Sequence, residues 1–213
     1  VTGIWQTVWL EKTPIKYIRN FRFFPNAKKG NIVVELETQG KGNAEIIVTY
    51  ENKEVGKVFA QVNDRHFFEI QLKEKHLWEI GNGRLYDVEI RFENDKVYSY
   101  FGLRDIAFNG KTFTLNGKPL FQRLVLDQGY NPKGLYTAEK DSDFVRDIEL
   151  AKKLGFNGAR LHQKLFEPRF LYYCDKMGFI VWGEYASWGA CYYNLDGLTS
   201  FLHEWKECIE RDF

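Results

Sequence analysis

This chain of 213 residues has little of what marks several common protein classes, beginning with cysteine. It has three cysteines, Cys174, Cys191 and Cys208, and their spacing matches no zinc or redox motif. Such an odd, sparse set does not form a disulfide framework, and we expect Cys174 and Cys208 to be buried thiols on apolar helical faces. No group of His, Cys and carboxylate residues has the spacing of metal ligands, so we predict neither a metal nor a cofactor.

An excess of charge of one sign is also missing. The 30 Lys and Arg residues nearly balance the 29 Asp and Glu residues, and no run of like charge occurs. We therefore predict no nucleic-acid partner and no membrane partner. No stretch approaches the roughly 20 apolar residues of a transmembrane helix, and the first residues lack the basic leader and apolar core of a signal peptide. These absences leave the compartment undetermined.

Aromatic residues, by contrast, are abundant and make up 17% of the chain. One interpretation is a core rich in large side chains. The other adds aromatic platforms on which a flat ligand such as a sugar ring stacks.

The first half of the sequence shows the alternation that is typical of β-strands. β-Branched and aromatic residues recur at every second position in six short segments, separated by clusters of Asn, Gly, Lys and Asp. The segments are 17–24, 31–38, 44–50, 55–60, 66–72 and 86–92. Several short strands at this spacing predict an immunoglobulin-like β-sandwich. A last strand and a crossing segment follow over 97–110, and the pair Asn116-Gly117 then predicts a tight hairpin.

From residue 121 the pattern changes to strands and helices in alternation. The expected strands cover 121–126, 156–161 and 179–182, and the expected helices cover 142–154, 168–177 and 199–211. Gly155 after the first helix and Pro168 in the first turn of the second are typical boundary signals. This succession describes three βα units of a parallel sheet. A complete (β/α)8 barrel needs about 250 residues, so the units would form a small open sheet or the first part of a barrel.

Polar residues follow each of these expected strands. Asp127 leaves the first strand, Arg160 and His162 leave the second, and Glu184 leaves the third. The carboxyl ends of parallel strands share one edge of the sheet, where α/β folds bind their ligands. The second strand separates the two carboxylates, however, and neighbouring strands are about 4.8 Å apart. We therefore do not expect Asp127 and Glu184 to form a catalytic pair.

Several long motifs resemble glycoside hydrolase family 2, the family of β-galactosidases, β-glucuronidases and β-mannosidases. They are TGIWQTVWLE at 2–11, SYFGLRDI at 99–106, FTLNGKPLFQR at 113–123, GFNGARLHQKLFEPRFLYYCDKMGF at 155–179 and VWGE at 181–184. The resemblance runs in order along the whole chain. It implies that residues 1–13 are the tail of a jelly-roll sugar-binding domain and that residues 14–104 form an immunoglobulin-like β-sandwich. Residues 105–213 would form the incomplete N-terminal part of a TIM (β/α)8 barrel.

The resemblance also implies an activity. The parent protein would be a retaining glycosidase that cleaves terminal β-glycosides, in the first place a β-galactosidase-like enzyme, through a covalent glycosyl-enzyme intermediate. In this family the acid/base glutamate follows the fourth barrel strand and the nucleophile follows the seventh. We therefore expect both catalytic glutamates after Phe213, no catalytic residue within the chain, and no activity of the chain alone.

The same resemblance gives roles to the residues at the strand exits, and each role has a structural alternative. Arg160 matches an arginine that supports the catalytic glutamates, and the alternative is an ion pair at the barrel rim. Glu184 matches the glutamate after the third strand, as a support or a hydroxyl contact. Asp127 and His162 would contact sugar hydroxyls or cap loops, although LHQK stands where relatives have a Ser-His-Tyr-Pro turn. Trp188 would form a stacking wall or pack at the rim.

A hypothesis of a different class is a non-catalytic carbohydrate-binding or interaction module. Aromatic residues bind sugars, and immunoglobulin-like sandwiches often mediate contacts. Under both hypotheses the expected partner is a carbohydrate, which the enzyme would bind as a β-glycoside substrate. The unpaired edge of the third strand adds the hypothesis of a homo-oligomer formed through that edge.

Overall fold

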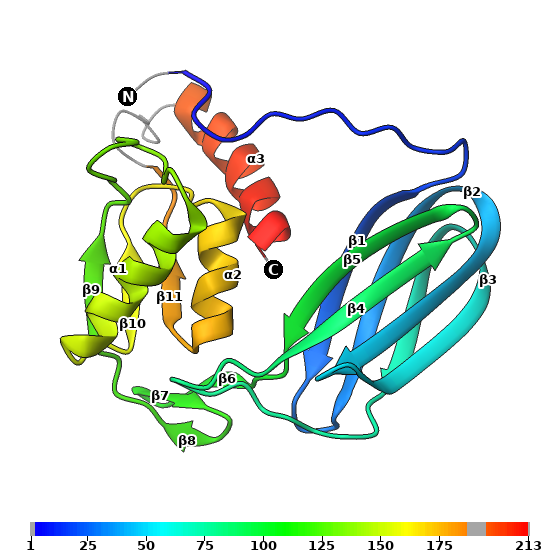
Figure 1. Cartoon of the computed structure of the whole chain (residues 1–213), viewed down its shortest axis with the longest axis horizontal. Coiled ribbons are helices and arrows are strands. Elements are labelled where there is room, and N and C mark those ends of the chain that lie inside the picture. The colour runs from blue at the N-terminus through cyan, green and yellow to red at the C-terminus, as the bar shows by residue number, and fades with distance from the viewer. Residues whose placement is uncertain (1–2, 187–194, 213) are drawn as a thin grey trace. The chain divides into compact units, whose positions relative to one another are not determined.

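The computed structural model describes residues 3–186 and 195–212 and divides the chain into two compact units (Figure 1). The first unit consists of Val1–Val8, Ile80–Gly83 and Phe121–Phe213, and the second consists of Trp9–Glu79 and Arg84–Leu120. Each unit has a hydrophobic core of its own.

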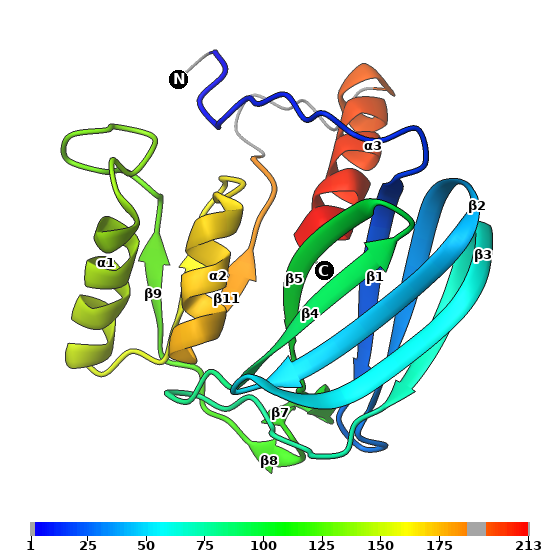
Figure 2. The ribbon, with the colours of Figure 1, turned by 45° about the vertical axis from the view of Figure 1, so that its right-hand side comes forward.

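The second unit is built around a curled antiparallel sheet of five strands. These strands are β1 (Ile18–Asn26), β2 (Asn31–Tyr50), β3 (Lys53–Gln71), β4 (Leu85–Phe92) and β5 (Asp95–Gly102). β2 and β3 pair along most of their length, whereas β1 pairs with the first part of β2 and β4 pairs with its second part. Figures 1 and 2 show the long β2–β3 ribbon curving, so that the two halves of the sheet face each other.

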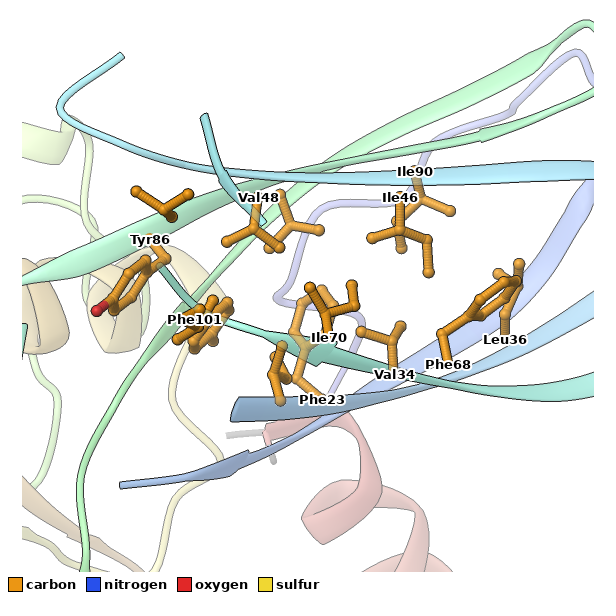
Figure 3. Packing of buried hydrophobic residues seen from close by; sticks show 14 of the residues in the cluster. Phe23, Val34, Leu36, Ile46, Val48, Phe68, Ile70, Tyr86, Ile90 and Phe101 are labelled. Carbon is orange, nitrogen blue, oxygen red and sulfur yellow. The ribbon is translucent and has the colours of Figure 1, made fainter. Parts of the chain in front are cut away.

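An apolar core fills the space between the two halves of this sheet. Figure 3 shows Val34 and Ile70 on one side of the core and Ile46, Val48 and Ile90 on the other. None of these five residues is more than 2% exposed. Buried and more exposed positions alternate along β4, which confirms the period-two pattern of the sequence there.

Two pairs of predicted strands are single strands in the structure. The segments 31–38 and 44–50 both lie in β2, and the segments 55–60 and 66–72 lie almost entirely in β3. Between the two parts of β2 the register with β3 shifts, and Gly40 there has a positive φ of 85°. Irregularities of this kind let a strand bend strongly while its pairing continues on either side. The polar, glycine-containing segment that interrupts the pattern is therefore a bend.

A small three-stranded antiparallel sheet completes the second unit. It consists of β6 (Ile106–Asn109), β7 (Thr112–Leu115) and β8 (Lys118–Pro119). Asn116 and Gly117 form the predicted turn between β7 and β8, with φ angles of 52° and 76°. Two consecutive positive φ angles are what a type I′ hairpin turn requires. β6 is a finding of the structure, because the sequence predicts only a crossing segment there.

The first unit contains a three-stranded parallel sheet with helices. The elements are β9 (Leu124–Asp127), α1 (Asp141–Lys153), β10 (Gly158–Leu161), α2 (Pro168–Met177), β11 (Ile180–Gly183) and α3 (Leu195–Asp212). β10 lies in the middle and pairs in parallel with β9 and β11, while α1 and α2 pack on one face of the sheet (Figure 2). All three predicted strands and all three predicted helices are present in this unit.

α2 begins and ends where the sequence predicts because local signals fix both ends. Pro168 occupies the first turn, where its missing N–H has no helical partner to lose. Gly178 closes the helix in the left-handed conformation, with φ 65°, which residues with a side chain rarely adopt. Phe170 and Cys174 lie one turn apart on the buried face, so α2 packs as an amphipathic helix.

The largely β architecture with its curled sheet is consistent with the predicted immunoglobulin-like sandwich. Three βα units do not make a barrel, so the predicted TIM barrel stays a prediction. Within residues 3–186 and 195–212, no helix is long and apolar enough to cross a membrane.

Candidate functional site

The parallel sheet of the first unit has one face covered by helices and one open face. Ala159 and Leu161 of β10 lie in the core beneath α1 and α2, and each is 1% exposed. Because side chains alternate along a strand, Arg160 between them belongs to the opposite face, where it is exposed. Its partners in the strand register are Leu126 on β9 and Trp182 on β11, which are 52% and 43% exposed.

Glu184 returns to this open face two residues after Trp182 and binds Arg160. Its carboxylate accepts a hydrogen bond from Nε of Arg160, and the two charges form an ion pair that joins the exits of β10 and β11. The Arg160 hydrogen bond lowers the pKa of the Glu184 carboxyl below its ordinary value of 4.5, against the opposing effect of burial. The same hydrogen bond raises the pKa of Arg160. At neutral pH Glu184 is therefore an anion held by an arginine.

The exit turn of β10 contacts the exits of both neighbouring strands. The His162 N–H donates to the carbonyl oxygen of Asp127 at 2.7 Å, which extends the β9–β10 pairing by one step. The His162 ring nitrogen Nδ1 lies 3.2 Å from Nε2 of Gln128. Gln163 then has a positive φ of 51°, and its backbone N–H donates to Glu184. The turn thus places His162 beside the loop after β9 and joins Gln163 to the carboxylate after β11.

Asp127 lies on the other face of the sheet. It pairs in register with Leu161, a residue of the helix-covered face, and it lines a small pocket with residues of α1 and α2. Its Oδ1 accepts a hydrogen bond of 2.7 Å from the N–H of Gly129, so Asp127 caps the turn after β9. Loop capping is one of the two interpretations that the sequence allows for Asp127. A contact with sugar stays a prediction.

The pocket beside Asp127 holds a buried cation that the sequence did not single out. The pocket has a volume of about 40 Å³, and its lining includes Lys164, Asp147, Glu167 and the aromatic residues Phe144 and Phe170. Burial lowers the pKa of the Lys164 ammonium, while the charges of Glu167 and Asp127 oppose that shift. Burial also raises the pKa of the Asp147 carboxyl. A charged residue in the segment HQKLFE gives no sequence signal of its own burial.

The aromatic wall predicted at Trp188 lies outside the residues that the structure describes. Next to that segment, Tyr185 packs its ring edge-on against Phe201 and Trp205 of α3, with ring centroids 5.0 and 5.7 Å apart. Its hydroxyl donates a hydrogen bond to the Glu204 carboxylate, and burial raises the pKa of Tyr185 to about 12. Tyr185 therefore packs against α3 through its ring and its hydroxyl.

The open face offers a held arginine, an anionic glutamate and hydrogen-bonding groups at the strand exits. Asp127 and Glu184 lie on opposite faces with β10 between them, so the two carboxylates do not adjoin. Within residues 3–186 and 195–212, no group of three or more His, Cys, Asp or Glu side chains is arranged to hold a metal ion. Such a surface can bind and orient polar groups of a ligand.

Comparisons with known proteins agree with the motifs. Residues 16–104 match the family described as "Glycosyl hydrolases family 2". The chain is 28% identical over 208 residues to a β-galactosidase of Thermoanaerobacterium thermosulfurigenes, an alignment that covers 87% of this chain and 29% of that protein. It is 31% identical over 144 residues to a β-glucuronidase of Streptococcus agalactiae, covering 64% of this chain and 23% of that protein.

The fold has close counterparts among solved structures. The β-glucuronidase of Ruminococcus gnavus superposes with a TM-score of 0.80 and 19% identity, covering 93% of this chain and 35% of that one. At this identity the likeness concerns the fold alone. The chain spans less than a third of the length of the two sequence relatives, 29% and 23%.

Proposed function

This chain belongs to glycosyl hydrolase family 2, and from that membership we propose that the protein containing it hydrolyses β-glycosides. The reaction removes a terminal sugar from an O-glycosyl compound with retention of configuration. In this proposal the curled sheet is an immunoglobulin-like sandwich, and the three βα units are the first part of a TIM barrel whose interior wall is the open face of the sheet.

A retaining glycosidase needs two carboxyl groups with different tasks. One protonates the leaving oxygen, and the other attacks the anomeric carbon to form a glycosyl-enzyme ester that water later hydrolyses. The two groups lie about 5 to 5.5 Å apart, and the proton donor has a raised pKa so that it holds a proton near neutral pH.

The Arg160–Glu184 ion pair is the observation that carries the assignment of roles. Arg160 lowers the pKa of Glu184, which is the wrong direction for a proton donor. Asp127 is on the opposite face of the sheet, so it is not a carboxyl partner for Glu184. We assign Arg160 and Glu184 to the supporting wall of the sugar site, with His162 at its edge. The two reacting glutamates would come from a part of the parent protein other than this chain.

The proposal predicts that the isolated chain is inactive. The purified chain is incubated with nitrophenyl β-galactoside and nitrophenyl β-glucuronide, and nitrophenol release is followed against a buffer blank. We expect no release above the blank. Release that Glu184→Gln abolishes would refute the assignment and make Glu184 a catalytic residue.

For the sugar we propose a neutral β-galactoside. The relative aligned over 208 residues is a β-galactosidase, which supports this choice. Arg160 is already neutralised by Glu184 and so offers no free charge to the carboxylate of a glucuronide. The parent protein should therefore hydrolyse the aryl galactoside with a higher kcat/KM than the aryl glucuronide, and the reverse order would refute this choice.

The alternative is a carbohydrate-binding module without catalysis. The exposed Trp182 on the open face is the observation that favours it, because aromatic rings beside polar groups stack on sugars. Calorimetric titration of the chain with galactose, glucuronate and mannose separates the two functions. Binding of any of them in the millimolar range favours the module, since an incomplete catalytic site should bind none of them there.

A further inference from the structure

Lys164 is the one buried lysine among the residues that the structure describes, and it lies beside the site without belonging to the open face. Its side chain is 5% exposed. Its Nζ donates to the carbonyl oxygens of Gly129 and Tyr136, at 2.6 and 2.7 Å. Both acceptors lie in the loop that follows β9, whereas Lys164 follows β10. The ammonium therefore clamps two neighbouring βα loops together by charge-assisted hydrogen bonds.

Aromatic rings enclose this ammonium. The Nζ atom lies 4.1 Å from the ring centre of Tyr136, 4.9 Å from that of Trp5 and 5.1 Å from that of Phe166. These distances are those of cation–π contacts, which strengthen where water is excluded. Trp5 comes from the start of the chain, and the neighbouring Gln6 also donates to the carbonyl oxygen of Leu165 at 3.1 Å. A segment about 160 positions away in sequence thus completes the cage.

Both backbone polar groups of Gly129 take part in the hydrogen bonds around this clamp. Its N–H donates to the carboxylate of Asp127, and its carbonyl oxygen accepts from Lys164. Its φ is 67°, and a Cβ at this position would lie 2.6 Å from Nζ of Lys164 and 2.9 Å from Cζ of Phe166. The glycine therefore lets the backbone approach the ammonium closely, in a conformation that other residues rarely adopt.

The clamp is next in sequence to a residue that contacts Glu184. Gln163, which precedes Lys164, has a positive φ and donates its N–H to Glu184. Fixing Lys164 in its cage fixes the direction of that N–H. We propose that Lys164 is a positioning residue that holds the Gln163 N–H, and through it the Glu184 carboxylate, in place on the open face of the sheet.

This inference deepens the proposed function, because it takes Glu184 to be part of the sugar site. The mechanical link itself runs through described contacts only and does not depend on activity. The test therefore measures hydrogen exchange and a pKa. A failure of the proposed function would appear in the hydrolysis assays and would leave these measurements unchanged.

The test compares Lys164→Met with Lys133→Met in the 213-residue chain. Methionine keeps most of the length and apolar volume of lysine but neither its charge nor its donors. Lys133 belongs to the same loop and is exposed, so its variant controls for a lost positive charge. In Lys164→Met we expect the amides of Gly129 and His162 to exchange about tenfold faster or more, because two charge-assisted hydrogen bonds are lost. The amides within α2 should keep their rates.

Glu184 supplies the readout that a purely structural role would not move. Its carboxyl carbon is titrated by NMR in the wild-type chain and both variants. In Lys164→Met the pKa of Glu184 should rise, because the Gln163 N–H is no longer held against it, while Lys133→Met should leave the pKa unchanged. An unchanged Glu184 pKa in Lys164→Met, or equal acceleration of exchange in α2, would overturn the proposal.

A second variant keeps the test decisive if Lys164→Met does not fold. Trp5→Leu removes one face of the cage and leaves both hydrogen bonds of the ammonium in place. It should produce the same two changes to a smaller extent: faster hydrogen exchange at the amides of Gly129 and His162, and a higher pKa of Glu184. If neither change occurs in Trp5→Leu, the caged clamp does not position Glu184.

Discussion

The two faces of the parallel sheet predict that the same substitution has very different consequences on neighbouring strands. Leu161 on β10 is 1% exposed in the core beneath α1 and α2, whereas Leu126 on β9 is 52% exposed on the open face. Truncating a fully buried leucine to alanine costs about 2 to 5 kcal/mol, from lost burial and from the cavity that remains. For Leu126→Ala we expect about 1 kcal/mol or less, because half of the side chain is already in water.

Cys174 reports the opening of this unit specifically. It is 1% exposed in the same core, and burial raises the pKa of its thiol, so reagents modify it only when the unit opens. The assay uses a chain in which Cys191 and Cys208 are replaced by serine, and follows thiol labelling under native conditions. When reclosing is faster than labelling, the rate follows the population of the open form.

The expected rates follow from the free energies. At 1.36 kcal/mol per factor of ten, Leu161→Ala should speed the labelling of Cys174 roughly 30-fold to 5,000-fold, and Leu126→Ala roughly fivefold at most. Equal acceleration by both variants, or a larger effect of Leu126→Ala, would refute the division into a covered and an open face. The placement of Arg160 and Glu184 on the open face would then be wrong as well.

Three further predictions follow from individual contacts. Gly158→Ala should destabilise the first unit by about 1 to 3 kcal/mol or more, because its Cβ would lie 2.1 Å from the carbonyl oxygen of Ile180. The control is Gly183→Ala, whose Cβ would have no atom within 4 Å and which should leave the rate of Cys174 labelling nearly unchanged. Asn116→Ala should lower the denaturation midpoint of the second unit more than Asn116→Asp does. Alanine loses both side-chain hydrogen bonds of Asn116, the one it donates to the Trp78 carbonyl and the one it accepts from the Asp105 N–H, whereas aspartate can still accept from Asp105. Glu184 has a lowered pKa in the folded chain, so the stability it contributes is present above its unfolded pKa, near 4.5, and is lost as pH falls through the folded pKa. Arg160→Met should therefore flatten the curve of unfolding free energy against pH in this range. An unchanged slope would contradict the Arg160–Glu184 ion pair.

Elements with local signals could be predicted from the sequence to within a few residues. α2 has both bounds as predicted, because proline and glycine act through their own backbone geometry, whatever packs around them. The turn at Asn116-Gly117 was predicted correctly for the same reason. β2 and β3 show the limit of such signals, since a bent strand and two separate strands give the same interrupted alternation. Only the continued pairing on both sides of the bend distinguishes them.

The strand exits at which the candidate residues lie could be predicted from the sequence, whereas the face of the sheet on which each lies could not. Strand order from the βα succession was enough to separate Asp127 from Glu184. Their opposite faces were not predictable, because β9 reads Leu-Val-Leu and such a run does not reveal which side is covered. Lys164 was missed because its burial depends on Trp5 and Tyr136, which come from distant positions in the chain. Burial that non-local contacts create leaves no mark on the local pattern.

Under the proposed function, the Arg160–Glu184 contact gives Glu184 a task that is compatible with its lowered pKa. A guanidinium is a planar fork with five N–H donors, and Glu184 engages it through Nε. Holding the fork by one edge fixes the plane of the group and the direction of its remaining donors. An arginine on the wall of a sugar site can then donate to the hydroxyl groups of a sugar without first losing its rotamer freedom, which preorganises that contact. Glu184 therefore orients Arg160, and the clamp at Lys164 in turn orients Glu184.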